Sequence, residues 1–519
     1  MAYLWRRSVW FGVMIPDCKL ELDWLKRWKL YAPANVALQS GETGKKVTYR
    51  ELFEQACSLS EVLRARFGIT KGDRVACVAQ NELEYVSLFF ALQRLGAILV
   101  PINFRFTATE VEHIARDSGA KLVIFERQFL DAVKGLERCA DLWCFDGPDS
   151  LQEVCARGYI PNETLDSEKF WGEFDDPVMI LYTSGTTGFP KGAVISHRMI
   201  FWNSVNTGLR LNLTENEVVA TFLPLFHTGG WNVLTTPCLH RGGKVILLRK
   251  FDADLILNLC HHEKVTVLFG VPTTMEFLRR SALFGSVNLS SVRYAIVGGE
   301  PMPIDLIRQW ETRGIPIRQG YGLTEFGPNV FSLNEEDSQR KMGSIGFPNF
   351  YCEAQVLNEF GREVGANEVG ELVLRGPMAM SGYWNNPKAT AEVLREGWLH
   401  TGDLVRRDDE GYFYVIGRKK EMYISGGENV YPAEVEKVLR EVPGVREVAV
   451  IGVPNEKWGE AGRAYLSFEE SATAISADEL TAYCQRHLAK FKVPLEFIFL
   501  KDLPKTESGK IAKKALAEL

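Results

Sequence analysis

Hydrophobic and polar positions along the chain follow two periods that alternate with each other. Short runs rich in β-branched residues have the length and composition of buried strands, at residues 73–79, 97–102, 121–125, 178–183, 243–248, 265–272 and 293–299. Between them, segments 48–67 and 107–119 carry apolar residues at the three-to-four spacing of amphipathic helices. Strand and helix signals in this order predict an α/β fold built from layered, largely parallel sheets.

The pattern changes twice towards the C-terminus. Beyond residue 340 the apolar runs shorten, as at 370–376 and 411–418, which predicts a β-rich subdomain. Beyond residue 420 the predicted elements are a helix opening at Pro432, strands at 445–453 and 495–500, and a helix whose capping box is Ser476 and Glu479. We therefore expect an N-terminal domain over residues 1–419 and a small α+β domain over residues 420–519.

Composition narrows the class of protein. The chain has 519 residues, enough for two or more domains with a large core. Its formal net charge of −6 shows no overall excess of positive charge of the kind that binds nucleic acid. No apolar run reaches the roughly 18–20 residues that span a bilayer. Ten cysteines are scattered without a C-x-x-C pair, which favours a reducing, cytoplasmic location and no structural zinc. The adjacent His261 and His262 fit a solvated helix end better than a metal site.

The N-terminal segment has an unusual composition. Four of the twelve tryptophans lie within the first 28 residues, beside several arginines and lysines. A signal peptide is not expected, because an A-x-A-like cleavage site is missing. Such a segment suits either packing on the domain, which we favour, or a weak peripheral contact with a membrane.

One glycine-rich stretch indicates chemistry. SGTTGFPKG (Ser184–Gly192) follows the apolar run Pro177–Thr183. Glycine lets backbone N–H groups approach an anion closely, hydroxyl groups add donors, and Lys191 adds positive charge. The spacing differs from the P-loop pattern G-x-x-x-x-G-K-[ST]. A flexible surface turn is the alternative, but the residue types favour a loop that holds phosphate.

This stretch is one of an ordered series of motifs. Downstream come LPLFHTGG, VGGEPMP, QGYGLTEFGP, GYWNNP, HTGD, GRKKEM and PKTESGKI, between residues 223 and 511. With this series the chain resembles the adenylate-forming superfamily of acyl- and aryl-CoA synthetases, luciferases and adenylation domains, over nearly its whole length. The resemblance implies a large N-terminal domain of stacked sheets and helices, a small mobile C-terminal lid, and an active site between them. It also implies two steps: a carboxylate attacks the α-phosphorus of ATP, and the thiol of coenzyme A then displaces AMP.

The resemblance assigns expected nucleotide contacts. The β- and γ-phosphates are expected at Thr183, Ser184, Gly185, Thr186, Thr187, Gly188 and Lys191. Thr324 and Glu325 resemble the phosphate and Mg²⁺ contacts, although a Thr-Glu pair is also an ordinary helix cap. Adenine is expected at Gly298, Gly299, Glu300 and Tyr321, and the nucleotide is also expected to contact Gly320 and Gly322. Asp403 is expected to contact the ribose, with an ordinary turn as the alternative, and Arg418 is expected to reach the ribose or a phosphate.

The C-terminal motifs carry the remaining catalytic expectations. Lys510 resembles the lysine that bridges the carboxylate and the α-phosphate, whereas a solvated lysine in a basic tail is the other interpretation. Lys420 occupies the family's hinge position, where the lid rotates between the two steps. Ser425, Gly426 and Gly427 are expected to line the tunnel for the pantetheine arm of coenzyme A.

The acid substrate is less well defined by the sequence. The acyl pocket is expected at Phe226, His227, Trp231, Asn232, Val271 and residues 326–328. His227 either gates this pocket or packs in the core. No aspartate lies near His227 to pair with an ammonium group, which argues against an α-amino acid. Gly229 and Gly230 would leave room for a slender alkyl chain.

We therefore expect a CoA ligase for a medium- or long-chain fatty acid. An aromatic acid of the benzoate or cinnamate type is the main alternative. A fatty acyl-AMP ligase that transfers to a carrier protein, and a luciferase-like oxygenase, are further alternatives. A homodimer is compatible with the resemblance.

Overall fold

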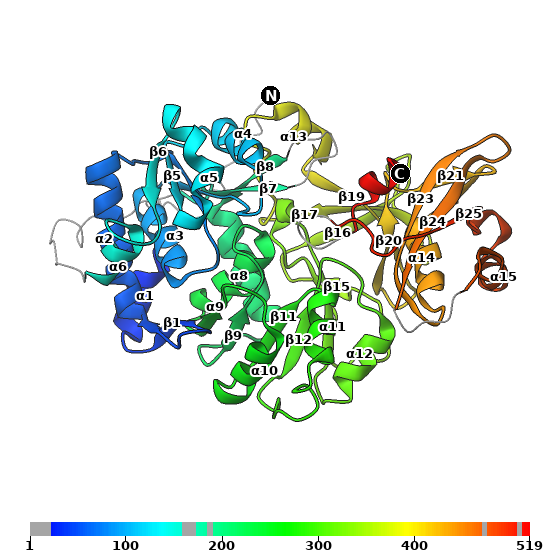
Figure 1. Cartoon of the computed structure of the whole chain (residues 1–519), viewed down its shortest axis with the longest axis horizontal. Coiled ribbons are helices and arrows are strands. Elements are labelled where there is room, and N and C mark those ends of the chain that lie inside the picture. Colours follow the sequence, from blue (N-terminus) through cyan, green and yellow to red (C-terminus); the bar gives the residue numbers. More distant parts are fainter. Residues whose placement is uncertain (1–21, 158–172, 184–189, 470–474, 506–510) are drawn as a thin grey trace, which may run out of the picture.

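The structure is a computed structural model that describes residues 22–157, 173–183, 190–469, 475–505 and 511–519. The chain is organised around four sheets, with the N-terminal part (blue to green) at the left and the C-terminal part (orange to red) at the right of Figure 1. None of the helices in these described ranges has both the length and the apolar composition needed to cross a membrane. The tryptophan-rich stretch at residues 1–21 lies outside the described residues.

Two sheets form the body of the protein. The nine-stranded sheet has the order β15 (Phe347–Pro348), β14 (Phe331–Ser332), β13 (Ile317–Tyr321), β12 (Tyr294–Val297), β11 (Val267–Gly270), β9 (Val218–Thr221), β10 (Lys244–Leu247), β1 (Val36–Ser40) and β2 (Lys46–Thr48). The six-stranded sheet has the order β6 (Asp141–Cys144), β5 (Leu122–Phe125), β3 (Arg74–Val78), β4 (Ile98–Pro101), β7 (Pro177–Thr183) and β8 (Lys191–Ser196). Most neighbouring strands in both sheets are parallel, as the alternating pattern predicts.

The largest core cluster fills the space between these two sheets. Three helices contribute to it: α2 (Tyr49–Phe67), α3 (Leu83–Leu95) and α8 (His197–Arg210). The outer face of the nine-stranded sheet is covered by α10 (Ala253–His262), α11 (Pro272–Arg280) and α12 (Ile304–Glu311), and α4 (Ala108–Ser118) covers the outer face of the six-stranded sheet. The remaining N-terminal helices are α1 (Trp24–Tyr31), α5 (Leu130–Val133), α6 (Leu151–Ala156) and α9 (Thr235–His240), with single turns η1 (Arg127–Phe129), η2 (Lys134–Arg138), η3 (Gly229–Val233) and η4 (Thr324–Phe326).

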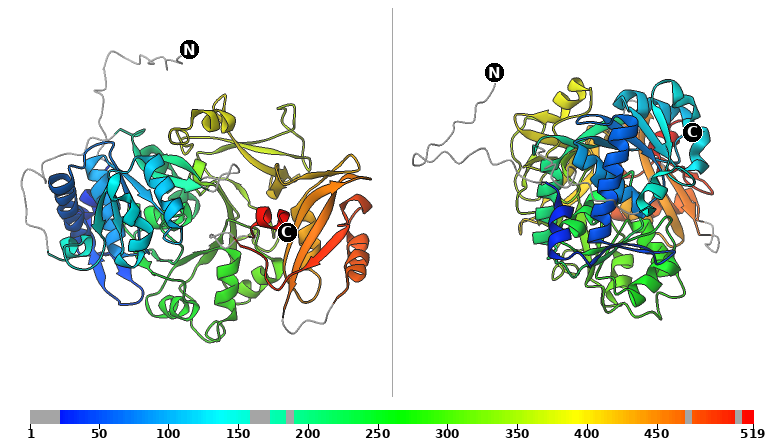
Figure 2. Two further views of the ribbon diagram at one scale, coloured as in Figure 1. Left: turned by 45° about the horizontal axis from the view of Figure 1, so that its top comes forward. Right: turned by 90° about the vertical axis from the view of Figure 1, so that its left-hand side faces the viewer.

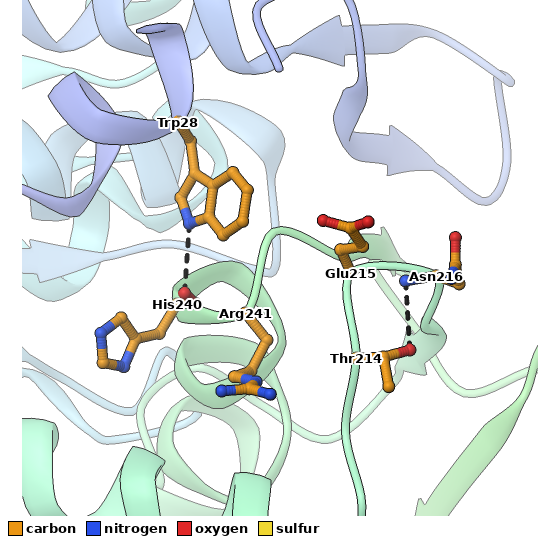
Figure 3. A pocket seen from close by; sticks show the side chains of 6 residues that line it. All are labelled: Trp28, Thr214, Glu215, Asn216, His240 and Arg241. Atoms are coloured by element: carbon orange, nitrogen blue, oxygen red, sulfur yellow. Dashed lines mark hydrogen bonds between the residues drawn. The ribbon is translucent and has the colours of Figure 1, made fainter. Parts of the chain in front are cut away.

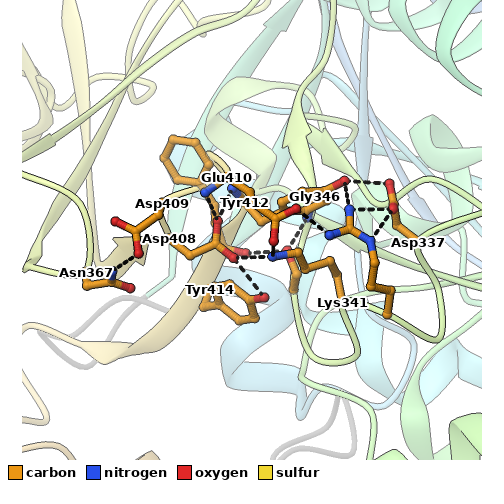
Figure 4. Close-up of polar contacts among 12 residues, drawn as sticks. Asp337, Lys341, Gly346, Asn367, Asp408, Asp409, Glu410, Tyr412 and Tyr414 are labelled. Atoms are coloured by element: carbon orange, nitrogen blue, oxygen red, sulfur yellow. Dashed lines mark hydrogen bonds and ion pairs between the residues drawn. The ribbon is translucent and has the colours of Figure 1, made fainter.

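The predicted β-rich subdomain is a five-stranded sheet. It contains β16 (Glu353–Leu357), β17 (Val369–Arg375), β19 (Trp398–Arg407), β18 (Leu394–Arg395) and β20 (Phe413–Arg418), with α13 (Pro387–Val393) beside it. The turn between β19 and β20 is held by charges (Figure 4): Lys341 Nζ lies 2.8 Å from Asp408 and 2.6 Å from Glu410, and the Tyr412 hydroxyl donates to Asp337 at 2.6 Å. These contacts tie the turn to the loop that follows β14.

The last sheet belongs to the small C-terminal domain, which lies beside the body (Figure 2). Its strands are β22 (Glu428–Val430), β21 (Tyr423–Ser425), β24 (Gly459–Phe468), β23 (Val445–Asn455) and β25 (Glu496–Phe499), with α14 (Pro432–Arg440), α15 (Ala477–His487), η5 (Lys490–Lys492) and α16 (Lys513–Ala517). Ser476 and Glu479 form the expected capping box at the start of α15. The expected domain boundary after residue 419 falls between β20 and β21, where the chain leaves one sheet and enters the other; the boundary itself stays a prediction.

Candidate active site

A cavity of about 1350 Å³ lies where the loops after several parallel strands meet. These loops follow the carboxyl ends of β9, β11, β12 and β13, the edge at which open α/β sheets bind ligands. The predicted residues that line it are Thr183, Lys191, Phe226, His227, Val271, Gly298, Gly299, Glu300, Gly320, Tyr321, Gly322, Thr324, Glu325, Pro328, Arg418 and Lys420. Residues from distant motifs are therefore gathered in one cavity, although their individual roles stay predictions. Ser184, Gly185, Thr186, Thr187, Gly188 and Lys510 lie outside the described residues.

A tyrosine links the glycine-rich hairpin to the YGLTE motif. The Tyr383 hydroxyl donates to Glu325 Oε1 at 2.8 Å, and Thr183 Oγ1 lies 3.5 Å from the same oxygen. Lys191 Nζ lies 5.5 Å from the centre of the Tyr383 ring. Burial, followed by the charge of Glu325, raises the pKa of Tyr383 well above its ordinary value, so the phenol stays a neutral donor. No role for Tyr383 was inferred from the sequence, although it belongs to the GYWNNP motif.

Metal binding can be tested against this carboxylate. Among the residues that the structure describes, no group of three or more His, Cys, Asp or Glu side chains could hold a metal by itself. Glu325 is thus a single carboxylate beside the loop expected to hold phosphate. That arrangement fits Mg²⁺, which keeps several waters and is commonly bound by one or two carboxylates together with substrate phosphates.

A second polar group joins three of the predicted residues. Asp403 accepts a hydrogen bond from the Tyr321 hydroxyl at 2.5 Å. It also forms an ion pair with Arg418, whose Nε lies 2.7 Å from the carboxylate. The antiparallel register of β19 and β20 places Asp403 opposite Arg418. Burial and the charge of Asp403 raise the pKa of Tyr321 well above its ordinary value. Burial disfavours the charge of Arg418, yet Asp403 holds the pKa of Arg418 above its usual range.

The predicted adenine region is shaped by backbone constraints. Gln319, which was missed in the sequence, donates to the carbonyls of Val297 and Glu300 at 3.2 Å and thereby fixes the loop after β12. A Cβ atom at Gly322 would lie 1.7 Å from the Pro328 carbonyl oxygen, so only glycine fits there. A Cβ at Gly298 would lie 3.6 Å from its nearest protein atom. Glycine is therefore not required at position 298 to avoid a clash with the protein. The missing side chain instead leaves space in the cavity.

The acyl-pocket expectation requires a correction. Phe226, His227 and Val271 line the cavity, but Trp231 and Asn232 do not. Trp231 is fully buried and packs against Tyr85 and Phe89, with ring centres 5.8 and 5.1 Å away, while Asn232 is buried among other polar side chains. The physical reason is the π-helical turn η3, which directs the Trp231 side chain towards α3.

The glycine next to Trp231 also has a structural explanation. A Cβ at Gly230 would lie 2.2 Å from the Pro224 carbonyl oxygen. Gly230 is therefore required by the close approach of two backbone segments. Its presence is no sign of space reserved for an alkyl chain.

The hinge and tunnel residues occupy different positions relative to the cavity. Lys420 lines the cavity, and burial followed by the charge of Arg418 lowers its pKa. Ser425, Gly426 and Gly427 are not among the lining residues; Ser425 ends β21, and the two glycines form the turn that leads to β22. Gly426 and Gly427 have φ of +63° and +86°, as a two-residue type I′ hairpin requires. The turn alone accounts for both glycines, and the tunnel role stays a prediction.

A smaller pocket of about 390 Å³ lies away from these motifs (Figure 3). Trp28 forms one side of it and donates through Nε1 to the His240 carbonyl at 3.1 Å. A Cβ at Gly242 would lie 2.5 Å from the Trp28 ring. The pocket is thus a notch left where α1 packs on the end of α9, and none of the predicted site residues line it.

The sequence is similar to those of known enzymes over nearly its whole length. The AMP-binding enzyme family matches residues 25–384, and the AMP-binding enzyme C-terminal domain matches residues 434–510. Feruloyl-CoA synthase of an Amycolatopsis species is 39% identical over 95% of this chain and 97% of the relative. Indoleacetate–CoA ligase of Aromatoleum aromaticum is 36% identical over 96% of this chain and 97% of the relative. Long-chain-fatty-acid–CoA ligase FadD13 of Mycobacterium tuberculosis is also 36% identical, over 96% of this chain and 98% of the relative.

Solved structures agree with this assignment. ATP-bound MatB from Rhodopseudomonas palustris superposes with a TM-score of 0.89 at 33% identity, covering 96% of this chain and 99% of MatB. MenE from Bacillus subtilis in complex with ATP and magnesium ion superposes with a TM-score of 0.85 at 32% identity, covering 95% and 99%. The resemblance inferred from the motif series and the expected fold are both confirmed. The chain belongs to the AMP-binding, adenylate-forming enzyme family, among its acid–CoA ligases.

Proposed function

We propose that the protein is an aryl-CoA ligase, which activates an aromatic carboxylic acid with ATP and transfers the acyl group to coenzyme A. In the first step a carboxylate oxygen bonds to the α-phosphorus and the bond to pyrophosphate breaks. In the second step the thiol sulfur bonds to the acyl carbon and AMP leaves. The substrate carboxylate is itself the nucleophile, so the protein has to position charges and needs no nucleophilic side chain.

One observation carries the choice of an aromatic acid. The lining of the cavity includes the rings of Phe226, His227 and Phe269, together with the aliphatic side chains of Val233 and Ile296. Flat, apolar walls of this kind suit a planar ring, because aromatic pairs contribute about 0.5–1.5 kcal/mol beyond their buried area. The likeness to feruloyl-CoA synthase and indoleacetate–CoA ligase supports the same choice.

In this proposal the polar residues of the site hold the nucleotide, the metal ion and the carboxylate of the acid. Lys191 and residues 184–188 would hold the β- and γ-phosphates, Thr324 would contact phosphate, and Asp403 with Arg418 would hold the ribose. Glu325 would hold Mg²⁺, which, when bound, offsets negative charge on the phosphates. Lys510 would bridge the carboxylate and the α-phosphate. Lys420 would be the hinge for the lid.

A medium- or long-chain fatty acid is the second candidate. The likeness to FadD13 favours it. Gly229 favours it as well, because a Cβ there would lie 3.5 Å from the Phe269 ring, and its absence leaves room in the cavity. Against it stand the backbone explanation for Gly230 and the polar side chain of Asn329 among the lining residues. The amide nitrogen is already bonded to Thr207 and Val233, and an alkyl chain end placed against the amide would offer no donor to its oxygen.

The test is a mass-spectrometric acyl-CoA assay with ATP, Mg²⁺ and coenzyme A. Acids from acetate to oleate, together with benzoates, cinnamates and arylacetates, would be compared by kcat/KM. We expect the highest value for an aromatic acid, with AMP formed one-for-one with acyl-CoA. A maximum among the long alkyl acids would overturn the aromatic assignment. Acyl-adenylate that accumulates without thioester would show that the acceptor is another thiol.

A further inference from the structure

A lysine near the C-terminus is held between two carboxylates. Lys513 is the first residue of α16, and its Nζ lies 2.8 Å from Glu436 and 2.9 Å from Glu421. Glu436 is buried and also accepts a hydrogen bond from the backbone nitrogen of Val450 at 2.9 Å. Burial disfavours the charge of Lys513, yet the two carboxylates hold its pKa above its usual range. Lys513 is therefore a cation that connects α16 to two other parts of the chain.

The two carboxylates lie in different places. Glu436 belongs to α14, inside the small domain. Glu421 directly follows Lys420, the residue proposed as the hinge, in a turn closed by a 3.0 Å hydrogen bond from the Glu421 backbone nitrogen to the Arg418 carbonyl. Lys513 therefore ties the C-terminal helix to the first residue beyond the proposed hinge.

The residue before the proposed hinge is held by the body of the protein. Lys419 Nζ lies 2.9 Å from Glu371 on β17, and the Lys419 backbone nitrogen donates to the Gly402 carbonyl at 2.9 Å. The chain is thus bound to the five-stranded sheet immediately before Lys420 and to the C-terminal helix immediately after it. Rotation about Lys420 would therefore carry α16 along with the small domain as one body.

The C-terminal helix is in turn connected to the segment that contains Lys510. Lys505 and Ile511, the described residues on either side of that segment, pair as an antiparallel bridge. Farther along, Leu516 is fully buried, and its carbonyl accepts a hydrogen bond from the Tyr465 hydroxyl at 2.7 Å. The position of α16 therefore sets where both ends of that segment lie.

We infer that Lys513 is a positioning residue for the adenylation step, which acts through its ion pair with Glu421. The pair holds α16, and with it the ends of the segment that contains Lys510, in a fixed place relative to the hinge. This inference rests on the proposed function, because it uses the roles proposed there for Lys510 and Lys420. The thioester step, in which Lys510 has no proposed role, should depend on the ion pair much less.

The first test is Lys513→Met in the full-length protein, which removes the charge and keeps most of the side-chain volume. Adenylation would be measured by ATP–pyrophosphate exchange with the acid that the wild type uses best, and thioester formation from supplied acyl-adenylate and coenzyme A. We expect adenylation to fall about 10- to 100-fold, because a displacement of about 1 Å at a reacting group has effects up to that size. Thioester formation should stay nearly unchanged, whereas a merely structural role would lower both rates by the same factor.

Glu421→Gln isolates the contact on the hinge side. It keeps the pair of Lys513 with Glu436, so this variant decides alone if Lys513→Met does not fold. We expect the same selective loss of adenylation. Because the charge of Glu421 also acts on Arg418, the double variant is informative: if Glu421 acts through Lys513, Glu421→Gln should add little in the Lys513→Met background.

Lys492→Met is the matched control. Lys492 lies 2.7 and 2.8 Å from the two carboxylate oxygens of Glu434, which is also on α14. Its side chain is 22% exposed, against 23% for Lys513. Glu434 is not part of the turn around Lys420, so this variant should keep the wild-type ratio of the two half-reaction rates.

The outcomes separate the inference from the proposed function. Unchanged adenylation in Lys513→Met, equal loss of both half-reactions, or the same selective loss in Lys492→Met would overturn the role of Lys513 while the wild type still forms acyl-CoA. Turnover confined to alkyl acids would overturn the proposed aromatic substrate. The Lys513 comparison would still stand, because it can be made with any acid that the wild type accepts.

Discussion

Removal of the Tyr383 hydroxyl tests how the site positions Glu325, the carboxylate proposed to bind Mg²⁺. The hydroxyl donates to Glu325 Oε1 at 2.8 Å. No described residue donates to Oε2, which leaves that oxygen for a cation. The bond therefore orients Glu325 without competing for the same oxygen. Tyr383→Phe deletes one atom and leaves the ring, with Lys191 near it, in place.

The magnitude follows from the kind of bond that is lost. A hydrogen bond to a charged group contributes about 1.5–3 kcal/mol. Glu325 is partly exposed to the cavity, so water replaces some of this interaction, and the only other side-chain contact is the weak one with Thr183 at 3.5 Å. We therefore expect a loss near the lower end, about 1.4 kcal/mol, which corresponds to a tenfold change.

The assay is ATP–pyrophosphate exchange, measured as a function of Mg²⁺ concentration. Tyr383→Phe should lower kcat/KM for ATP about tenfold and raise the half-saturating Mg²⁺ concentration several-fold, without a change in unfolding midpoint large enough to explain the loss. Tyr412→Phe is the matched control, because that phenol also donates to a carboxylate, Asp337, at 2.6 Å and does not line the cavity. An unchanged Mg²⁺ dependence in Tyr383→Phe, or an equal shift in both variants, would refute the positioning role.

Three further predictions concern Lys510, Lys420 and the glycines of the cavity. Lys510→Ala should abolish adenylation while leaving thioester formation from supplied acyl-adenylate largely intact; equal loss of both half-reactions would contradict this division. Lys420→Pro should slow thioester formation more than adenylation, because proline fixes φ at the proposed hinge, and comparison of the two half-reaction rates checks it. Gly322→Ala should cost about 3 kcal/mol in urea unfolding, because its Cβ would lie 1.7 Å from a carbonyl oxygen. Gly298→Ala, with 3.6 Å of clearance, should instead leave stability unchanged and lower the affinity for ATP; destabilisation in Gly298→Ala would refute this contrast.

The regular elements were largely predictable from the sequence because their patterns are local. The helix α2 starts where Thr48 and Glu51 form a capping box and ends at Gly68 in the left-handed conformation. The helix α3 was missed for an equally physical reason. Eleven of its thirteen residues are buried, Leu83–Gln93, and a helix enclosed on all sides has no polar face to create a 3.6-residue period.

The parts of the site that were missed depend on contacts between distant segments. Tyr383 and Glu325 are 58 positions apart, and their hydrogen bond leaves no local signature. The error at Trp231 has a related cause. A tryptophan beside an apolar motif is equally compatible with a cavity wall and with a core, and the direction of its side chain is decided by one π-helical turn.

The arrangement of β19 and β20 connects nucleotide binding with the proposed hinge. Asp403 and Arg418 face each other across this strand pair, and Lys420 follows two residues later. At the other end of the pair, Lys341 is bound to two carboxylates of the turn. The pair is therefore anchored at its turn and leads into the small domain at its far end. If Lys420 is the hinge, rotation of the lid leaves Asp403 and Arg418 in place, because both precede the pivot, so AMP can stay bound while the thiol enters.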